Sequence, residues 1–275
     1  RTESTDGVFS IVLTRAEEYN TITPQLRDDL REAIDEGDED ADARAILITA
    51  EGPAFCAGYA LDLAIAHQDE EETSQRAWDS VTDMRLMSSF VDVYLKLWYA
   101  SKPTIAAVQG WCIAGGTDMV LCADIIVASE SAVFGYPPAR AWGVPTTPMW
   151  VYRMGLEKAK RYLLTGDEIP APEAVRCGLI LEAVPDNILG EHARDLARRI
   201  ARLPLTQLVM LKMLCNQVAE NMGMASTRTL GTLFDGIARH TQEGVDFVRR
   251  AEEVGFREAV RERDNPFGDY GSRRR

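Results

Sequence analysis

The sequence predicts an α/β fold followed by a helical region, and three observations lead to this prediction. Short apolar runs, bounded by glycine, proline and polar residues, alternate with helix-like segments through the first half of the chain. This alternation is typical of layered strands and helices. From Gly155 onward the pattern is almost wholly helical, and the composition shifts near Pro204. We therefore expect an α/β core over residues 1–203 and a C-terminal helical region over residues 204–275.

Local signals predict the individual elements. Apolar runs of strand length predict buried strands at Gly7–Thr14, Arg44–Ala50, Pro103–Gln109 and Asp124–Ala128. Thr23 is a suitable N-cap, and Pro24 a suitable first residue, for a helix with apolar positions Leu26, Leu30 and Ile34. A polar helix over Gln68–Ser80 and a helix with an apolar stripe that ends before Pro103 are expected next. The last helices are expected at Asn187–Leu203, Leu205–Met222 and Ala225–Arg263.

The composition excludes several classes of partner. The 275 residues include 30 basic and 43 acidic side chains, which gives a formal charge of −13. Nucleic acids and anionic membranes repel a surface of this sign, so neither is an expected partner. No apolar run approaches the roughly 20 residues that a membrane-spanning helix needs.

The cysteines and histidines form no metal-binding or disulfide pattern. The five cysteines are scattered without a C-x-x-C pair, and the three histidines are far apart in the sequence. These features indicate reduced thiols, a cytoplasmic protein and no bound metal. Because the first residue is Arg1 and not methionine, a preceding targeting segment stays an open alternative.

Two glycine-containing loops, Phe55–Tyr59 and Ile113–Thr117, each connect a strand end to a helix start. Backbone N–H groups at a helix start have no partner within the helix and carry partial positive charge. Glycine allows a ligand oxygen to come close to this backbone. Two such loops that converge would offer two donors to one oxyanion, which stabilises an enolate or a tetrahedral intermediate. The alternative is a pair of tightly packed turns without a ligand.

Taken in order, several motifs resemble those of the crotonase superfamily, also called the enoyl-CoA hydratase/isomerase family. They are YNTIT, ILITAEGPAFCAGYALDL, SKPTIAAVQGWCIAGGTDMVLCADIIVAS, SAVFGYPPARAWGVP, LLTGDEIPAPEAVRCGLILEAVP and, in the helical C-terminus, RHTQEG. The resemblance covers essentially the whole chain. It implies a crotonase-like spiral of ββα units, with a helical C-terminal region that forms a homotrimer or a dimer of trimers. It also implies acyl-CoA thioesters as substrates. Coenzyme A is then part of the substrate, and no separate cofactor is expected.

The resemblance also assigns roles to single residues. The backbone N–H groups of Tyr59 and Gly115 match the two oxyanion donors, and Asp118 matches the first of two catalytic glutamates. The second glutamate position is Pro138, which can neither donate nor accept a proton. Residues expected at the substrate are Ala57, Gly58, Ala60, Leu61, Gly116, Tyr136, Pro138, Arg140 and Trp142. Arg140 could bind a carboxylate on the acyl group, or form an ion pair at the surface or an interface.

These residues favour a lyase whose nearest named reaction is the hydration of an enoyl-CoA, or its reverse. Isomerisation or other enolate chemistry is the close alternative. A non-catalytic acyl-CoA-binding protein is a second alternative, because Pro138 stands where an acid is expected. A cysteine hydrolase is a third, because the sequence around Cys112 loosely resembles a nucleophile elbow, although the closing glycine of that motif is absent.

Overall fold

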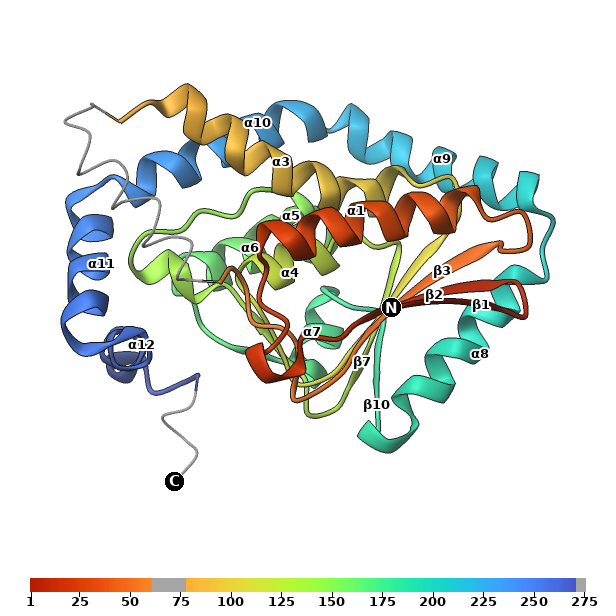
Figure 1. The fold of residues 1–275 in the computed structure, drawn as a ribbon, viewed down its shortest axis with the longest axis horizontal. Coiled ribbons are helices and arrows are strands. Elements are labelled where there is room, and N and C mark those ends of the chain that lie inside the picture. Colours follow the sequence, from red (N-terminus) through yellow and green to blue (C-terminus); the bar gives the residue numbers. More distant parts are fainter. Residues whose placement is uncertain (61–77, 271–275) are drawn as a thin grey trace.

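The computed structural model describes residues 1–60 and 78–270. Within these ranges, the larger sheet has six strands in the order β1-β2-β3-β5-β7-β10 (Figure 1). Their bounds are Thr2–Thr5, Val8–Leu13, Ala45–Ala50, Thr104–Val108, Ile125–Ser129 and Glu182–Val184. Neighbouring strands are parallel except for the antiparallel pair β1–β2.

A second sheet of four short strands has the order β4-β6-β8-β9. These strands are Ala54–Cys56, Trp111–Ile113, Val133–Gly135 and Ile169–Pro170. Strands β4 and β6 directly precede or contain the two glycine-containing loops, so their parallel pairing brings the loops together.

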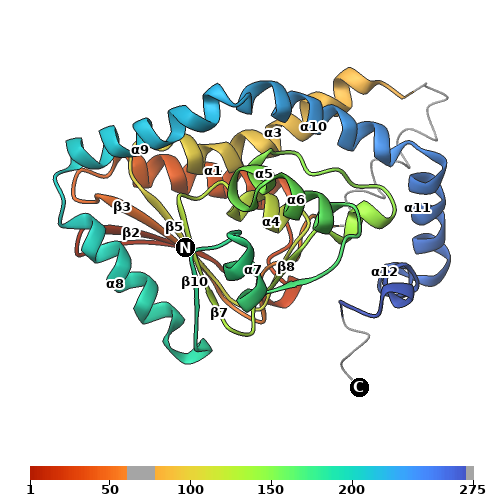
Figure 2. The same cartoon turned by 180° about the vertical axis from the view of Figure 1, so that it is seen from behind.

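Helices cover both faces of the larger sheet (Figures 1 and 2). Helices α1 (Pro24–Glu39) and α3 (Ser80–Tyr99) lie over one face, and α8 (Leu189–Ala201) lies over the other. In β3, Ile46 and Ile48 join the core that includes α1 and α3, whereas Leu47 joins the cluster beneath α8. Burial on both faces explains why these strands are continuous apolar runs in the sequence.

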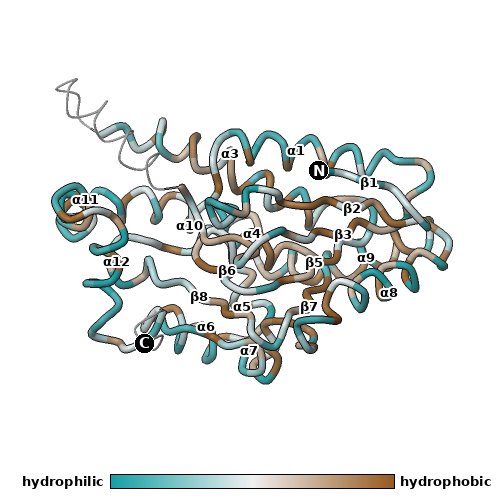
Figure 3. Tube along the Cα trace, turned by 60° about the horizontal axis from the view of Figure 1, so that its bottom comes forward, coloured by the Kyte–Doolittle hydropathy of each residue, from teal (hydrophilic) through white to brown (hydrophobic). Residues whose placement is uncertain are grey.

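Hydropathy along the chain follows these layers. Hydrophobic segments gather on the central strands, and hydrophilic residues follow the outer sides of α1, α8 and α11 (Gln242–Val254) (Figure 3). Thr23 caps α1 as predicted, because its Oγ1 accepts a hydrogen bond from Leu26 N at 3.1 Å.

The shorter helices α4 (Gly115–Val120), α5 (Met149–Met154), α6 (Leu156–Leu163) and α7 (Ala171–Cys177) connect the strands. The C-terminal region contains α9 (Leu205–Asn221), α10 (Met224–Arg239), α11 and α12 (Phe256–Asp264). Helix α10 packs on α3, and α12 contacts the turn Pro137–Arg140. The C-terminal helices therefore pack against the α/β part of the same chain and close one of its ends (Figure 1).

The predicted α/β class and the four predicted strands are confirmed, and the boundary at residue 203 stays a prediction. The expectation of an almost wholly helical segment after Gly155 is wrong at β9 and β10. Ala225–Arg263 is also not one helix. Thr241 accepts a hydrogen bond from Gly244 N and starts α11, and Gly255 has a φ of 83°, which ends it. The polar helix expected over Gln68–Ser80 falls mostly on residues 61–77, outside the described residues.

Candidate active site

The two glycine-containing loops meet at one point of the fold. A Cβ atom on Gly116 would lie 2.3 Å from the carbonyl oxygen of Cys56, and one on Gly58 would lie 3.0 Å from the Cβ of Ala114. No side chain fits at Gly116 without moving the backbone of the other loop. The loops therefore converge, as the two motifs predict, and glycine is what permits the approach.

The turn into α4 contains a strained residue. Ala114 has φ 55° and ψ −127°, a conformation that alanine rarely adopts. This turn places Gly115 at the first position of α4, where the helix supplies no acceptor for its N–H. Among the described residues, neither the N–H of Gly115 nor that of Tyr59 has a hydrogen-bond acceptor. Backbone strain of this kind tends to occur at functional sites, and here it accompanies two available donors.

Both loops border a cavity of about 210 Å³. Of the residues expected at the substrate or the oxyanion, seven line it: Ala57, Tyr59, Ala60, Gly115, Tyr136, Pro138 and Trp142. Most of the other lining side chains are apolar, such as Met87 and Phe90 from α3. Gly58 and Gly116 lie at the contact between the loops rather than in the cavity wall, and Leu61 lies outside the described residues.

The ring of Tyr59 is fixed on three sides. Its hydroxyl accepts a hydrogen bond from the Tyr94 hydroxyl at 2.9 Å, and it meets the Phe90 ring edge-on, with ring centroids 5.5 Å apart. A Cβ on Gly115 would lie 2.6 Å from its Cε2, so the ring packs directly on the start of α4. Burial raises the pKa of the Tyr59 phenol, which therefore stays protonated. The Tyr59 side chain thus shapes the cavity beside the two N–H groups.

Asp118 lies one helical turn after Gly115 and is 1% exposed. Its Oδ2 accepts hydrogen bonds from Thr146 N at 2.8 Å and Thr146 Oγ1 at 3.0 Å, and its Oδ1 accepts one from Trp150 Nε1 at 2.8 Å. Burial raises the pKa of this carboxyl to about 7, although the three hydrogen bonds favour the ionised form. Asp118 is not part of the cavity wall, although Gly115, one helical turn earlier, is.

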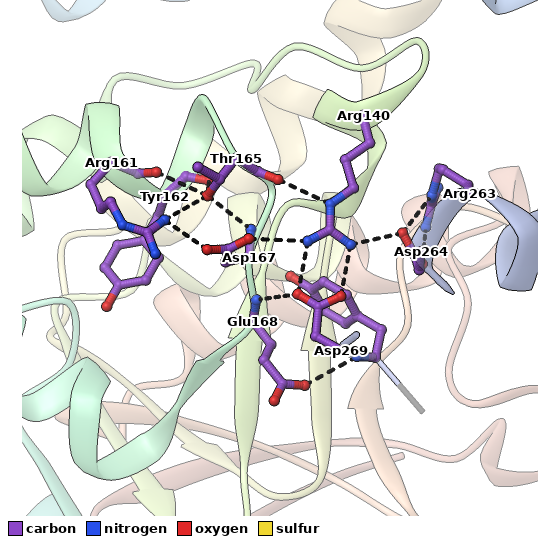
Figure 4. Close-up of polar contacts among 10 residues, drawn as sticks. Arg140, Arg161, Tyr162, Thr165, Asp167, Glu168, Arg263, Asp264 and Asp269 are labelled. Carbon is purple, nitrogen blue, oxygen red and sulfur yellow. Dashed lines mark hydrogen bonds and ion pairs between the residues drawn. The ribbon is translucent and has the colours of Figure 1, made fainter. Parts of the chain in front are cut away.

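Arg140 has a different environment from either one expected for it. Its guanidinium donates to Asp264, Asp269 and Asp167 at 2.7–3.2 Å, and its Nε donates to the carbonyl oxygen of Thr165 at 2.9 Å (Figure 4). All five N–H groups are thus used within the chain, and the side chain is 2% exposed. Arg140 neither lines the cavity nor forms a surface ion pair. Its buried ion pairs with Asp264 and Asp269 connect the C-terminal residues to the core.

The C-terminal helices contribute residues that the sequence analysis missed. Asp235 and Arg239 of α10, together with Phe256, Val260 and Arg263 from the segment around α12, complete the cavity wall. No local motif predicts a role at the cavity for these residues. They reach the cavity only because α10 packs on α3 and α12 packs on the turn at Arg140.

The alternative of a cysteine nucleophile finds no support at Cys112. This residue is buried in β6, does not line the cavity, and has a thiol pKa raised by burial. A thiol of this kind is not converted to the reactive thiolate. In the part of the chain that the structure describes, no group of three or more histidine, cysteine or acidic side chains could hold a metal ion. None of the described helices has the length and hydrophobicity needed to cross a membrane.

An α/β fold whose two glycine-containing loops meet at an apolar cavity is that of the crotonase class. The chain belongs to the enoyl-CoA hydratase/isomerase family, whose model matches residues 3–252. The chain is 41% identical to an enoyl-CoA hydratase from Mycobacterium smegmatis, whose crystal structure superimposes with a TM-score of 0.93 over 99% of this chain and 95% of that one.

Two further relatives extend the comparison. A crystal structure of an enoyl-CoA hydratase/isomerase from Xanthobacter autotrophicus has a TM-score of 0.88 at 26% identity, over 97% of each chain. The human enoyl-CoA hydratase domain-containing protein 3, mitochondrial, is 28% identical over 93% of this chain and 82% of its own. The predicted family is therefore confirmed.

Proposed function

We propose that the protein is an enzyme that acts on an acyl-CoA thioester, with the N–H groups of Tyr59 and Gly115 bound to the thioester oxygen. The observation that carries the proposal is that these two N–H groups, without acceptors among the described residues, lie at one mainly apolar cavity. Negative charge develops on the thioester oxygen when the α carbon becomes an enolate. Two fixed donors in a low-dielectric site stabilise that charge in the transition state.

The reaction that we propose is the hydration of an enoyl-CoA or its reverse, a lyase reaction. Isomerisation passes through the same enolate and is the close alternative. Coenzyme A enters as part of the substrate, so this chemistry requires no separate cofactor. The expected cytoplasmic location stays a prediction.

Asp118 is the proposed acid/base group that the family pattern retains. Its Oδ1 accepts a single hydrogen bond, so that oxygen keeps a position at which a proton can be held. A carboxyl with a pKa of about 7 exchanges protons readily at neutral pH. Asp118 lies one helical turn after Gly115, whose N–H is one of the two proposed donors.

Replacing Asp118 with asparagine is expected to lower kcat/KM for enoyl-CoA by about 100-fold or more, because an amide cannot transfer the proton. The matched control is Asp124→Asn. Asp124 is also largely buried and accepts hydrogen bonds from Thr104, but it lies away from the cavity. The control should lower the melting temperature and leave kcat/KM within about threefold. Folded Asp118→Asn protein with wild-type kcat/KM would show that Asp118 transfers no proton.

The activity itself is tested by incubating the purified protein with a panel of 2-enoyl-, 3-enoyl- and 3-hydroxyacyl-CoA thioesters. Loss of 2-enoyl-CoA with formation of 3-hydroxyacyl-CoA supports hydration, and conversion of 3-enoyl- to 2-enoyl-CoA supports isomerisation. Tight binding of a thioester without turnover of any of them would instead support the non-catalytic alternative.

We also propose that the protein forms a homotrimer or a dimer of trimers through its C-terminal helices. Helix α9 carries five apolar side chains that are each more than half exposed in the single chain, and its C-cap Met222 is a sixth: Met210, Leu211, Met213, Leu214, Val218 and Met222. An apolar patch of this kind is typical of a contact between subunits. Light scattering is expected to give three or six times the mass of the chain, and the mass of a single chain would contradict this.

A further inference from the structure

The proposed reaction needs two proton transfers, and Pro138 provides no group for one of them. Water must lose a proton as its oxygen bonds to the β carbon, and the α carbon must gain one. Pro138 lines the cavity at the position where the family resemblance expects the second acid. The inference below rests on the proposed function and concerns the group that replaces this acid.

Among the described residues that line the cavity, Asp235 is the only one with a carboxyl group. It lies on α10, almost a hundred residues after Pro138 in the sequence. Helix α10 approaches the loop 143–147 closely, because a Cβ on Gly231 would lie 2.7 Å from the carbonyl oxygen of Pro145. One turn further along the helix, Asp235 reaches the same loop, where Val144 N lies 3.4 Å from its Oδ1.

The hydrogen-bond capacity of Asp235 is mostly unused. The bond from Val144 N is long, and the nearest guanidinium nitrogen, Arg239 Nε, lies 3.5 Å from Oδ2. The other end of Arg239 is held more tightly by Asp83, whose two oxygens accept from Nη2 at 2.8 and 3.0 Å. Asp235 is 8% exposed and lies close to one positive charge. Its carboxylate can therefore still accept a hydrogen bond from a molecule in the cavity.

The loop 143–147 connects Asp235 to Asp118. Val144 N faces Asp235 and Thr146 N donates to Asp118, so two N–H groups two residues apart hold the two carboxyl groups. The negative charge of Asp235 is also one of the causes that raise the pKa of Asp118. The cavity thus has one carboxyl group in its wall, and a second one is bound to the same loop.

We propose that Asp235 is the second acid/base residue of this active site and that it acts together with Asp118. In the hydration direction, the Asp235 carboxylate accepts a proton from water while the water oxygen bonds to the β carbon. The electron pair of the C=C bond moves toward the thioester, whose oxygen is held by Tyr59 and Gly115. The α carbon then gains a proton from the carboxylic acid of Asp118, passed on by a water molecule because Asp118 does not itself line the cavity. Water is added across the double bond, and one proton has passed from Asp118 to Asp235, to be returned through solvent.

The surroundings of the two carboxyl groups fit this division of roles. Burial raises the pKa of Asp235 to about 6, and the Arg239 guanidinium limits the rise. Asp118 has a pKa of about 7, so at neutral pH Asp235 is mostly ionised while about half of Asp118 is protonated. The charged and titratable groups around Asp235 are Arg239 on its own helix, Asp83 on α3, Asp118 on α4, and the phenols of Tyr59 and Tyr136. In the wild type, kcat/KM should rise through pH 6 and fall above pH 7.

The test compares Asp235→Asn with Asp83→Asn. Both changes remove a carboxylate from Arg239, but Asp83 does not line the cavity. Asp235→Asn should lower kcat/KM for 2-enoyl-CoA by about 100-fold or more and should abolish the rise of activity through pH 6. The dissociation constant of a saturated acyl-CoA should stay within about threefold. Asp83→Asn should keep kcat/KM within about fivefold and keep the rise through pH 6.

A second variant, Asp235→Ser, gives the same test if the asparagine variant does not fold, and the same loss is expected. The inference is overturned if either folded variant keeps kcat/KM within about fivefold, or if Asp83→Asn reproduces the whole loss. The proposed function would still hold after that result if the wild type converts thioesters of the panel. A wild type that converts none of them would overturn both.

Discussion

Replacing Gly116 with alanine is expected to lower kcat/KM by about 100-fold or more, although this residue does not line the cavity. The new Cβ would lie 2.3 Å from the carbonyl oxygen of Cys56 and 3.0 Å from its carbonyl carbon, so the two loops must separate. Separation moves the N–H of Gly115 away from that of Tyr59. Loss of one donor from a pair of this kind typically lowers the rate by about 100- to 1,000-fold.

Gly190→Ala is the matched control for this change. Gly190 lies in the first turn of α8, and a Cβ there would have only the Arg194 guanidinium as a neighbour, at 3.6 Å. Alanine at this position should stabilise the helix by up to about 1 kcal/mol and leave activity unchanged. Steady-state kinetics on 2-enoyl-CoA and thermal melting of all three proteins provide the comparison. Wild-type kcat/KM in Gly116→Ala would show that the approach of the loops is not needed for activity.

Replacing Arg140 with alanine is expected to lower the free energy of unfolding by about 3–5 kcal/mol. The change removes the guanidinium that pairs with the buried carboxylates of Asp264 and Asp269, whose side chains are 5% and 6% exposed. Among the described residues, Asp264 then keeps only its ion pair with Arg263. It also removes the guanidinium from the face of the Phe267 ring, 3.8 Å away. Because α12 contacts the turn that contains Arg140, residues 264–270 should become sensitive to proteolysis.

Arg250→Ala is the matched control for Arg140→Ala. It shows how much stability is lost when another arginine of the C-terminal region is removed. Arg250 pairs with Glu253 and Glu262 at 2.7–3.0 Å, but its side chain is 45% exposed. Exposed pairs contribute little, so the expected loss of unfolding free energy is much smaller than that of Arg140→Ala. Urea unfolding of the two variants beside the wild type measures the difference. Equal losses in both would mean that the Arg140 cluster contributes no more than a surface ion pair.

The parts of this structure that could be predicted from the sequence are those set by neighbouring residues. The capping of α1 by Thr23, the four longer strands and the two glycine-containing loops all follow from signals within a few residues. The strands of the second sheet have two or three residues each, which is too short to show a periodicity.

The roles of Arg140 and Asp235 depend on distant parts of the chain and could not be predicted in this way. Arg140 pairs with Asp264, which lies 124 residues later, and Asp235 accepts a hydrogen bond from Val144 N, 91 residues earlier. Such contacts arise from helix packing, which no local pattern records. Only the family resemblance connected distant positions, and the roles that it assigned lie in the loops and α4, not in α10.

A crystal structure of the protein with a bound acyl-CoA tests the central claim most directly, because it places the thioester oxygen. We expect this oxygen within about 2.7–3.1 Å of both Tyr59 N and Gly115 N, with the α and β carbons facing Asp235. A thioester oxygen bound elsewhere, with the acyl chain in the cavity and neither N–H in contact with it, would contradict the proposed function.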